Sequence, residues 1–395
     1  MSRYEIAFSG ELAPGATLEQ VEANLTRLFQ ADAQRIALLF SGRRVVIKQD
    51  LDYDSVEKYR QAMARAGAVA EVRPMPVEVE EIELAPPLGI GRARHIDDGL
   101  GRYVEYAKTT LPRGASLAGL KVVVDCAHGA AYKAAPEVLW ELGAEVVPLG
   151  VAPDGFNINR EVGSTHPRTA AETVVAHGAH VGLCLDGDAD RVVMIDETGT
   201  VADGDQFMAL LARRWAAEGR LRHNTLVATV MSNLGLEQCL AREGLRLERT
   251  AVGDRYVVER MRAGGFNLGG EQSGHIVMTD HATTGDGLIA GLQFLLAMVE
   301  EGQPASALAR QFEPVPQMLR NVRFQPGQTP MEAASVQAAM RSAASRLEGQ
   351  GRLLIRKSGT EPLVRVMAEC EDPALLQEIV EGLVAEIEAV LKAPA

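Results

Sequence analysis

The first part of the chain shows the alternation of apolar and polar positions that is typical of a small α/β unit. Four segments are predicted to be strands, because their apolar residues are continuous or recur at every second position: 4–9, 36–40, 45–47 and 69–72. Apolar residues recur at helical spacing over 18–29 and 56–66. The resulting order predicts a ferredoxin-like βαββαβ unit over residues 1–75. Its residues indicate no chemistry, which favours a structural role or the docking of a protein partner.

A stretch rich in Pro, Val and Glu comes next and predicts an extended linker over residues 76–94. Beyond it, continuous apolar strands at 121–125 and 181–185 alternate with helical segments such as 134–142. This alternation is typical of α/β domains whose ligand loops lie at the carboxyl ends of strands. We expect two α/β domains with mixed sheets and a final α+β domain: 95–200, 201–314 and 315–395.

The composition limits the partners of the chain. Lys and Arg number 40 against 53 Asp and Glu, so the formal net charge is −13, and no run of five or more like charges occurs. Binding to nucleic acid or to an anionic membrane depends on Lys/Arg patches, so we expect neither partner. The four cysteines form no CxxC pair, which disfavours a structural zinc site. No secretory or membrane-spanning segment is recognisable, which predicts a cytoplasmic protein.

The clearest chemical signal is the segment Asp186-Gly187-Asp188-Ala189-Asp190-Arg191, which directly follows a predicted buried strand. Its three carboxylates at alternate positions can converge on one hard divalent cation, for which Mg²⁺ is the best candidate. Arg191 can hold a phosphate oxygen beside the metal. The alternatives are an acidic surface turn and part of a calcium loop, although the closing glutamate of a calcium loop is missing.

A second segment, Gly269-Gly270-Glu271-Gln272-Ser273-Gly274-His275, lies between two short apolar runs. Its glycines let the backbone approach a ligand, and Glu271, Ser273 and His275 supply donors and acceptors of the kind that recognise sugar hydroxyls. His275 can also transfer protons near pH 7. A plain hairpin loop with a surface histidine is the alternative, and the segment taken alone favours it slightly.

A third segment, Arg356-Lys357-Ser358-Gly359-Thr360-Glu361-Pro362, is closely followed by Arg365. Its cations, two hydroxyls and the backbone N–H groups around Gly359 form a cup that suits a dianionic phosphate. A solvated basic turn is the alternative, but clustered cations in so acidic a chain favour phosphate. Taken together, the three segments describe a cleft for a phosphorylated sugar.

Residues 88–395, more than three quarters of the chain, resemble the second, third and fourth domains of the α-D-phosphohexomutases, in particular their bacterial glucosamine branch. The three segments above carry this resemblance together with further motifs: Gly91-Arg92-Ala93-Arg94, Ile96-Asp97-Asp98, Gly101-Arg102-Tyr103, Asp125-Cys126-Ala127-His128-Gly129-Ala130-Ala131-Tyr132, Pro153-Asp154-Gly155-Phe156-Asn157-Ile158-Asn159, Gly163-Ser164-Thr165-His166-Pro167, Met231-Ser232-Asn233-Leu234-Gly235, Gly253-Asp254-Arg255-Tyr256 and Thr283-Thr284-Gly285-Asp286-Gly287.

The resemblance implies a role for each candidate site residue. Mg²⁺ would be held by three carboxylates: Asp186, Asp188 and Asp190. The substrate's non-reacting phosphate would be held by five residues: Arg356, Ser358, Gly359, Thr360 and Arg365. Arg191 would lie against the reactive phosphate and take part in catalysis.

The sugar itself would be recognised by the second segment. Glu271 and Ser273 would bind its hydroxyls, and His275 would be a catalytic acid or base. Arg255 would line the same cleft, and Gln272 is the variant that resembles the glucosamine branch. The implied activity is an isomerase that interconverts glucosamine 6-phosphate and glucosamine 1-phosphate with Mg²⁺, on a phosphorylated hexose or hexosamine that binds in either of two orientations.

One departure from the family concerns the phosphoryl donor. In the family, an upstream first domain carries a phosphoserine loop of the type Ser-His-Asn-Pro, and this serine passes its phosphoryl group to the sugar. Residues 1–73 stand in that place here, and Ser9, Ser41 and Ser55 have no such surroundings. The segment Ser164-Thr165-His166-Pro167 matches a different motif, from the second domain. We therefore expect the nucleophilic serine to be absent and the activity to be impaired or dependent on a partner.

Two other functions stay open at this point. The chain can be a catalytically inactive phosphosugar-binding or regulatory protein that docks to a partner through residues 1–75. Alternatively, it can be a metal-dependent sugar-phosphate phosphatase in which water replaces the serine. A homo-oligomer is compatible with the sequence as well.

Overall fold

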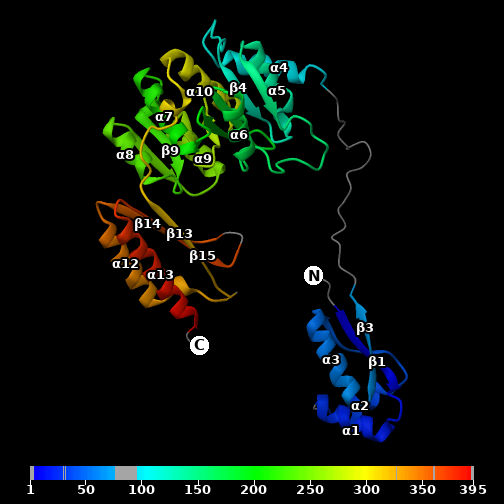
Figure 1. The fold of residues 1–395 in the computed structure, drawn as a ribbon. Coiled ribbons are helices and arrows are strands. Elements are labelled where there is room, and N and C mark those ends of the chain that lie inside the picture. Colours follow the sequence, from blue (N-terminus) through cyan, green and yellow to red (C-terminus); the bar gives the residue numbers. More distant parts are fainter. Residues whose placement is uncertain are drawn as a thin grey trace. The chain divides into compact units, whose positions relative to one another are not determined.

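The computed structural model of the chain describes residues 4–29, 31, 33–75, 96–325, 327–358 and 361–392. The chain divides into two compact units at His95 and Ile96, which Figure 1 shows in colours that follow the sequence. The predicted linker at 76–94 and the motif at 91–94 lie outside the described residues. Among the helices that the structure describes, none is long and apolar enough to cross a membrane.

The N-terminal unit is built on a three-stranded antiparallel sheet with the strand order β2-β1-β3. Its elements in chain order are β1 (Tyr4–Leu12), α1 (Leu18–Phe29), α2 (Ala33–Leu39), β2 (Val45–Leu51), α3 (Tyr53–Arg65) and β3 (Ala68–Pro74). Phe8 on β1 is fully buried, and it packs in one cluster with Leu25 of α1 and Met63 of α3. This cluster holds the helices against the sheet.

The strand predicted at residues 36–40 is wrong, because residues 33–39 form helix α2. Ile36 is buried and Leu38 is 63% exposed, while Phe40 meets Phe8 edge to face with 5.4 Å between ring centroids. Inward positions four residues apart are those of a helix. A short apolar run is compatible with either structure, and the high helix propensity of Ala and Leu favours the helix. The unit is therefore βααβαβ and not βαββαβ.

The second unit begins with a five-stranded mixed sheet, in the order β5-β4-β6-β7-β8. Strands β5, β4 and β6 are parallel to one another. Strand β7 is antiparallel to its neighbour β6, and β8 is antiparallel to β7. The elements of this region are α4 (Gly99–Thr109), β4 (Lys121–Asp125), α5 (Ala134–Glu141), β5 (Glu145–Leu149), α6 (Arg168–His177), β6 (Val181–Leu185), β7 (Val192–Asp196) and β8 (Val201–Ala202). Every residue of β6 is buried, so the strand delivers Asp186 to the sheet edge from a rigid base.

A four-stranded mixed sheet follows, in the order β10-β9-β11-β12, with β12 antiparallel to the others. Its elements are α7 (Gly204–Ala217), β9 (Thr225–Thr229), α8 (Leu234–Arg242), β10 (Arg246–Thr250), α9 (Asp254–Gly264), β11 (Leu268–Gly270), β12 (Ile276–Met278), α10 (Gly287–Glu301) and α11 (Ala305–Leu308). Phe207 of α7 and Phe294 of α10 meet edge to face at 5.6 Å, within a core cluster that also contains Leu183 of β6. One hydrophobic core therefore joins the two sheets and fixes the loops at their edges relative to one another.

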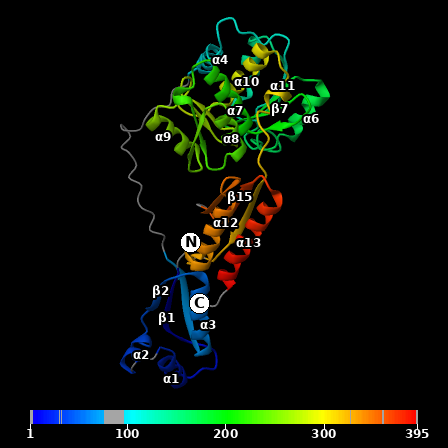
Figure 2. The same cartoon turned by 90° about the vertical axis from the view of Figure 1, so that its left-hand side faces the viewer.

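The C-terminal region is a three-stranded antiparallel sheet in the order β13-β15-β14. Its elements are β13 (Gln317–Arg323), α12 (Ala334–Leu347), β14 (Gly351–Lys357), β15 (Leu363–Cys370) and α13 (Pro373–Lys392). Both helices cover the same face of the sheet, as Figure 2 shows, and Val366 and Ala368 pack there against Ile379 of α13. The other face carries the alternate residues of each strand.

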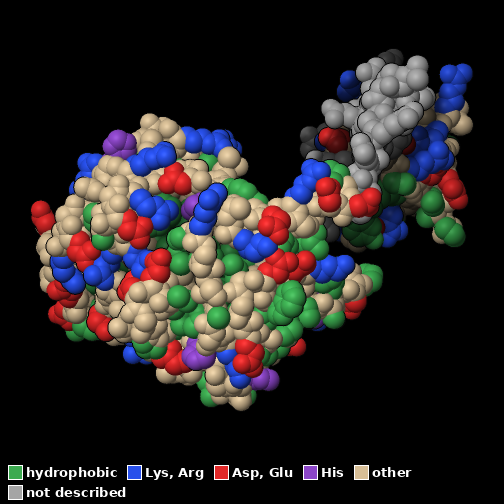
Figure 3. Space-filling model, turned by 90° about the horizontal axis from the view of Figure 1, so that it is seen from above, with side chains coloured by type: hydrophobic (Ala, Val, Ile, Leu, Met, Phe, Trp, Pro, Cys, Tyr) green, Lys and Arg blue, Asp and Glu red, His purple; other side chains and the backbone are tan. Residues whose placement is uncertain are grey.

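This architecture confirms the predicted multi-domain α/β fold with mixed sheets and a C-terminal α+β domain. On the face that Figure 3 presents, acidic and basic side chains are interspersed over the described surface.

Candidate active site

The three aspartates of the Asp186–Asp190 loop converge at the carboxyl end of β6. One oxygen from each of Asp186, Asp188 and Asp190 lies within 4.8 Å of the others. The loop closes as a turn, in which the N–H of Ala189 donates to the carbonyl of Asp186 at 3.1 Å and Ala189 has φ 63°. Three carboxylates this close repel one another, so the arrangement suits a bound divalent cation.

The electrostatics of the loop agree with a cation site. Burial raises the pKa of Asp186 to about 6, and the neighbouring charges of Asp190 and Asp188 act in the same direction against a backbone hydrogen bond from Arg191. The Oδ1 atom of Asp190 is buried and has no hydrogen-bond partner among the described residues. An oxygen in this state is a natural ligand for Mg²⁺, so the residues present fit the metal.

Arg191 lies between two of these carboxylates. Its Nε is 3.7 Å from Asp186 Oδ2 and 3.6 Å from Asp190 Oδ1, and it makes no hydrogen bond within the described part of the chain. The side chain is 41% exposed. The guanidinium is therefore held beside the cluster with donors left for an oxygen ligand such as phosphate.

The loop after β4 packs against the Asp186–Asp190 loop, called the metal loop below. The N–H of Ala130 donates to the carbonyl of Gly187 at 2.8 Å, and a Cβ on Gly129 would lie 2.1 Å from that same oxygen. Only glycine fits at this contact, which explains the physical need for Gly129 in the motif at 125–132.

The Glu271–His275 segment is the loop of a tight hairpin between β11 and β12. Glu271 Oε1 accepts the N–H of Gly253 at 3.0 Å, and Ser273 is exposed. Gln272 Nε2 donates to Asp203 Oδ2 at 3.1 Å, and the carbonyl of Gln272 accepts the N–H of Gly204 at 2.9 Å. Gln272 therefore holds the hairpin against the start of α7 by two hydrogen bonds, one from its side-chain amide and one to its backbone carbonyl.

The hairpin joins the metal loop directly. The N–H of Val192 donates to the carbonyl of Gly274 at 3.0 Å, and His275 Nδ1 lies 3.2 Å from Asp190 Oδ2. The histidine is only 2% exposed, and its Nε2 accepts the N–H of Gly285 at 3.2 Å. The structure therefore brings two segments that are distant in the sequence into one assembly.

Within the described structure, no hydrogen bond or ion pair joins Arg255 to this assembly. It stands at the start of α9 with its side chain 79% exposed, and its Nε lies 2.9 Å from Glu259 one helical turn on. Its neighbour Asp254 comes nearer to the hairpin, with Oδ2 at 3.8 Å from His275 Nε2.

The predicted phosphate cup lies on the C-terminal sheet. Arg356 of β14 and Arg365 of β15 stand directly opposite one another across the strand pair, with Asn321 of β13 beside Arg365. Burial and the charge of Arg365 lower the pKa of Arg356. The Nε of Arg365 is buried and makes no hydrogen bond in the part of the chain that is described. Like charges directly opposite one another destabilise a sheet, so this pair suits an anion.

The turn that completes the cup is described in part. The N–H of Ser358 donates to the carbonyl of Leu363 at 2.9 Å, which places Ser358 beside the arginine pair at the end of β14. Gly359 and Thr360 lie outside the described residues.

Two supporting residues escaped the interpretation of the sequence. Gly285 stands within the quoted motif at 283–287, and a Cβ on it would lie 2.5 Å from His275 Nε2. Glu369 is fully buried in β15 and accepts from Gln317 and Asn233 while pairing with Arg352. The available signal for Glu369 was an acidic residue that directly follows the apolar run Val366–Ala368.

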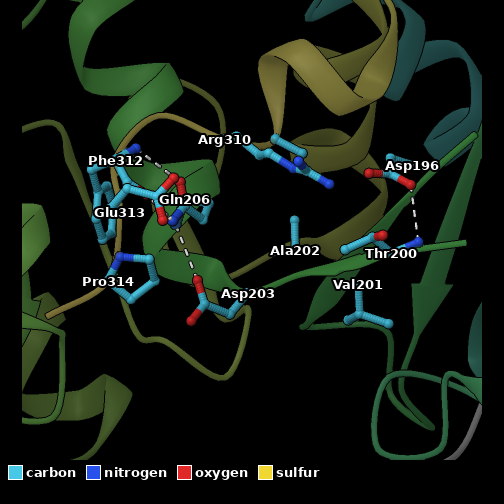
Figure 4. A pocket seen from close by; sticks show the side chains of 11 residues that line it. Asp196, Thr200, Val201, Ala202, Asp203, Gln206, Arg310, Phe312, Glu313 and Pro314 are labelled. Atoms are coloured by element: carbon cyan, nitrogen blue, oxygen red, sulfur yellow. Dashed lines mark hydrogen bonds between the residues drawn. The ribbon is translucent and has the colours of Figure 1, made fainter. Parts of the chain in front are cut away.

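A cleft of about 390 Å³ lies elsewhere, between the β7–β8 turn and the segment that follows α11. Figure 4 shows Asp203, Arg310 and Glu313 among its lining side chains, with Gln206 bonded to the carbonyl of Phe312. None of the predicted metal or phosphate residues lines it. The cleft shares only Asp203, the acceptor of Gln272, with the contacts described above.

Comparison with known families places three parts of the chain. Residues 101–199 match phosphoglucomutase/phosphomannomutase alpha/beta/alpha domain II, residues 203–315 match domain III, and residues 319–386 match the C-terminal domain.

The chain is similar to curated proteins named phosphoglucosamine mutase. It is 71% identical to one from Cereibacter sphaeroides over 307 residues, which cover 78% of this chain and 69% of that protein. It is 68% identical to one from Paracoccus denitrificans over 319 residues, or 81% of this chain and 71% of the relative.

Solved structures share the fold at low sequence identity. A phosphoglucomutase/phosphomannomutase family protein from Burkholderia thailandensis aligns with a TM-score of 0.64 at 20% identity, over 88% of this chain and 72% of that one. The Aspergillus fumigatus N-acetylphosphoglucosamine mutase, solved in complex with GlcNAc-6P and magnesium, aligns with a TM-score of 0.58 at 20% identity, over 72% of this chain and 69% of that one.

Proposed function

This chain belongs to the phosphoglucosamine mutase family of phosphohexomutase isomerases, and from that membership we propose that its site binds glucosamine 6-phosphate and glucosamine 1-phosphate together with Mg²⁺. The observation that carries the proposal is the assembly of the three-aspartate loop with the hairpin, because a candidate cation site and candidate hydroxyl-binding groups then lie at one place. The magnesium in the Aspergillus fumigatus structure supports the choice of metal.

We assign the binding of the reactive phosphate to the metal loop. Asp186, Asp188 and Asp190 would hold Mg²⁺, which when bound neutralises charge on the phosphoryl oxygens. The guanidinium of Arg191 would donate to an oxygen of the same phosphate, because its Nε is held beside the cluster without a hydrogen-bond partner of its own in the described chain.

We assign the non-reacting phosphate to the arginine pair. Arg356 and Arg365 face one another without a carboxylate between them in the described sheet, so a dianion relieves their repulsion. Ser358, Gly359 and Thr360 would add donors from the turn. The sugar, which lies between the two phosphate positions, would be bound by Glu271 and Ser273. Arg255 would lie near the edge of the same cleft.

None of the site residues named above is assigned the role of phosphoryl donor. The Ser-His-Asn-Pro motif of the family does not occur in the 395 residues. A mutase needs an in-line donor close to the sugar oxygen, and the loss of a covalent nucleophile costs orders of magnitude in rate. We therefore propose that isomerisation requires a phosphoryl donor that these 395 residues do not supply.

The test is a ³¹P NMR time course with glucosamine 6-phosphate, Mg²⁺ and a trace of hexose bisphosphate. It is run with the chain alone and with a separately expressed fragment that carries the Ser-His-Asn-Pro loop. We expect the 1-phosphate to accumulate much faster with the fragment. Asp188→Asn should abolish the effect and weaken metal binding, whereas Arg346→Ala, on the helix side of the C-terminal sheet, should not.

A second function has one observation in its favour. Residues 1–95 form a unit of their own, outside all three family matches. This agrees with a phosphosugar-binding protein that docks to a partner through residues 1–75. Calorimetric binding of glucosamine 6-phosphate, with no 1-phosphate formed under either condition, would favour that function. No binding at all would contradict both proposals.

A further inference from the structure

We propose that the groove between α1 and α2 of the N-terminal unit docks a basic amphipathic helix of a protein partner. This docking site rests on the second function proposed above, in which the chain docks through residues 1–75, and it adds the surface and the kind of partner. It does not depend on phosphosugar binding, because the N-terminal unit lies outside all three family matches.

The groove follows one side of α1 where α2 lies beside it, as Figure 1 and Figure 2 both show. Its volume is about 350 Å³. Four residues of α1 and two of α2 line it: Glu19, Glu22, Ala23, Thr26, Ile36 and Ala37. The four positions on α1 are spaced at i, i+3, i+4 and i+7, so they share one face over roughly 10 Å of helix. A third helix can lie along such a groove, because a ridge of its side chains fits between two neighbouring helices.

The floor and the walls of the groove are apolar. Ile36 is 3% exposed and belongs to the core of the unit. Ala23 and Ala37 are exposed, and their small side chains leave room above the floor. Thr26 Oγ1 donates to the carbonyl of Glu22 at 2.7 Å, which occupies the hydroxyl within α1 and leaves the methyl group for apolar contact. An aliphatic side chain of a partner would therefore be buried here.

The two carboxylates of the groove have no cation. The side chains of Glu19 and Glu22 make no hydrogen bond or ion pair among the described residues, and no Lys or Arg of those residues lines the groove. The first turn of α1 contains Glu19, where the helix dipole favours a carboxylate. Glu22 is half-buried, and the residues one turn away from it on α1 include Glu19 but no Lys or Arg. Like charges at this spacing repel, so a Lys or Arg of a partner would stabilise both.

The helix-free face of the N-terminal sheet lacks this property, because its charges are paired within the unit. Glu71 accepts from Ser9 Oγ at 2.6 Å and lies 3.3 Å from Arg44 and 3.0 Å from Arg73. Arg44 also pairs with Glu5. A partner gains little from charges that already have partners. The groove is therefore the better surface of this unit for a basic segment.

The test begins with a selection of peptides on the full chain. The probe is a phage library of random peptides of about fifteen residues, long enough to form a helix. It is selected on the wild type and counter-selected on Ala23→Leu, whose larger side chain fills the groove. We expect the enriched peptides to carry aliphatic residues together with Lys or Arg at helical spacing. An enriched pool without basic residues would overturn the proposal, and so would the absence of enrichment over Ala23→Leu.

Matched variants then test the charge and the shape of the groove separately, by fluorescence anisotropy of one labelled enriched peptide. We expect Glu22→Lys to weaken binding roughly 10-fold and Glu11→Lys, at an exposed position outside the groove, to change it less than about twofold. Ala23→Leu should weaken binding roughly 30-fold or more, and Ala64→Leu, at an exposed position of α3, should not. Circular dichroism shows whether each variant is folded. An equal loss in Glu22→Lys and Glu11→Lys would mean that net charge alone attracts the peptide.

The outcomes distinguish the docking site from the proposed phosphosugar site. Calorimetry with glucosamine 6-phosphate should give the same affinity for the wild type, Glu22→Lys and Ala23→Leu. If the peptides bind with the expected pattern but glucosamine 6-phosphate does not bind, the proposed function fails and the docking site stands. If no peptide is enriched and the wild type, but not Ala23→Leu, dimerises in sedimentation velocity, a second copy of the chain occupies the groove and the proposed basic partner is wrong.

Discussion

The helix-free face of the C-terminal sheet carries two rows of polar residues that differ in the charge of the residue on β15. In the first row, Arg352 of β14 stands opposite Glu369 of β15. In the second row, at the other end of the same strands, Arg356 stands opposite Arg365. The two rows share their strands, their face and an arginine on β14, so the residue opposite decides what each row does.

The side chains of the first row are hydrogen-bonded to residues 230–233, so this row attaches the C-terminal sheet to the domain before it. Arg352 donates to the carbonyls of Val230 and Ser232 at 2.9 and 2.7 Å, and Glu369 accepts from Asn233 at 3.2 Å. The second row keeps a buried donor, Arg365 Nε, without a partner in the described sheet. An arginine opposite a carboxylate thus serves the fold, and an arginine opposite an arginine leaves a place for an anion.

The largest expected effect comes from breaking the first row. Arg352→Ala leaves Glu369, which is fully buried, without its cation, so we expect the free energy of unfolding to fall by about 3–5 kcal/mol. Urea unfolding followed by circular dichroism measures this. The double variant Arg352→Ala with Glu369→Ala should recover part of the loss, because no buried charge is then left unpaired. A fall of less than about 1 kcal/mol in the single variant would contradict the structural role of the row.

The next largest effect comes from the second row and concerns binding. Arg365→Ala removes a donor that is free for phosphate, so we expect glucosamine 6-phosphate to bind about 10- to 100-fold more weakly, or about 1.4–2.8 kcal/mol. Stability should not fall, since a repulsion across the strands is removed. Calorimetry gives the affinity and urea unfolding gives the stability.

The matched control for Arg365 lies on the helices that cover the other face of the same sheet. Arg346 of α12 makes two hydrogen bonds to Glu378 of α13, at 3.0 and 2.8 Å, and it is exposed. Arg346→Ala changes the net charge by the same amount as Arg365→Ala. An equal loss of affinity in both variants would mean that charge alone, and not the arginine pair, holds the phosphate.

The sequence predicted much of this region but not the comparison itself. The cluster of Arg356 and Arg365 around a turn predicted a phosphate cup, which stays a prediction, and the strand–helix alternation indicated the sheets. The opposition of Arg356 to Arg365 depends on strand register, which a one-residue slip would change. The pairing of Arg352 with Glu369 depends on the same register, and no motif in the sequence indicates it.

Two other differences have equally specific causes. His275 and Asp190 meet only because one core packs the two mixed sheets together, and no local pattern records that contact. The helix at residues 33–39 replaced a predicted strand because a short apolar run carries no period of its own. The roles assigned to the individual site residues stay predictions, which the variants above address.

A further effect, on the pH dependence of stability, concerns a carboxyl group that adjoins the first row. Asp205 Oδ2 accepts the N–H of Asn233 at 2.8 Å, and Asn233 in turn donates to Glu369. Burial, together with the charge of Asp203, raises the pKa of Asp205 to about 7. Its oxygen Oδ1 has no hydrogen-bond partner in the described structure.

A carboxyl group whose pKa is higher in the folded than in the unfolded chain stabilises the fold when protonated, and this contribution is lost as the pH rises toward the folded pKa. Between pH 5 and pH 7 we expect Asp205 to cost the wild type about 2 kcal/mol, at about 1.4 kcal/mol per pH unit. Asp205→Asn mimics the protonated acid at every pH, so its advantage in stability over the wild type should grow by about 2 kcal/mol between pH 5 and pH 7. The difference between the two unfolding curves isolates this group, because Asp186 and every other carboxylate titrate in both proteins. Parallel pH dependences would show that Asp205 is ionised in the fold over this pH range, with its charge offset by the nearby Arg249.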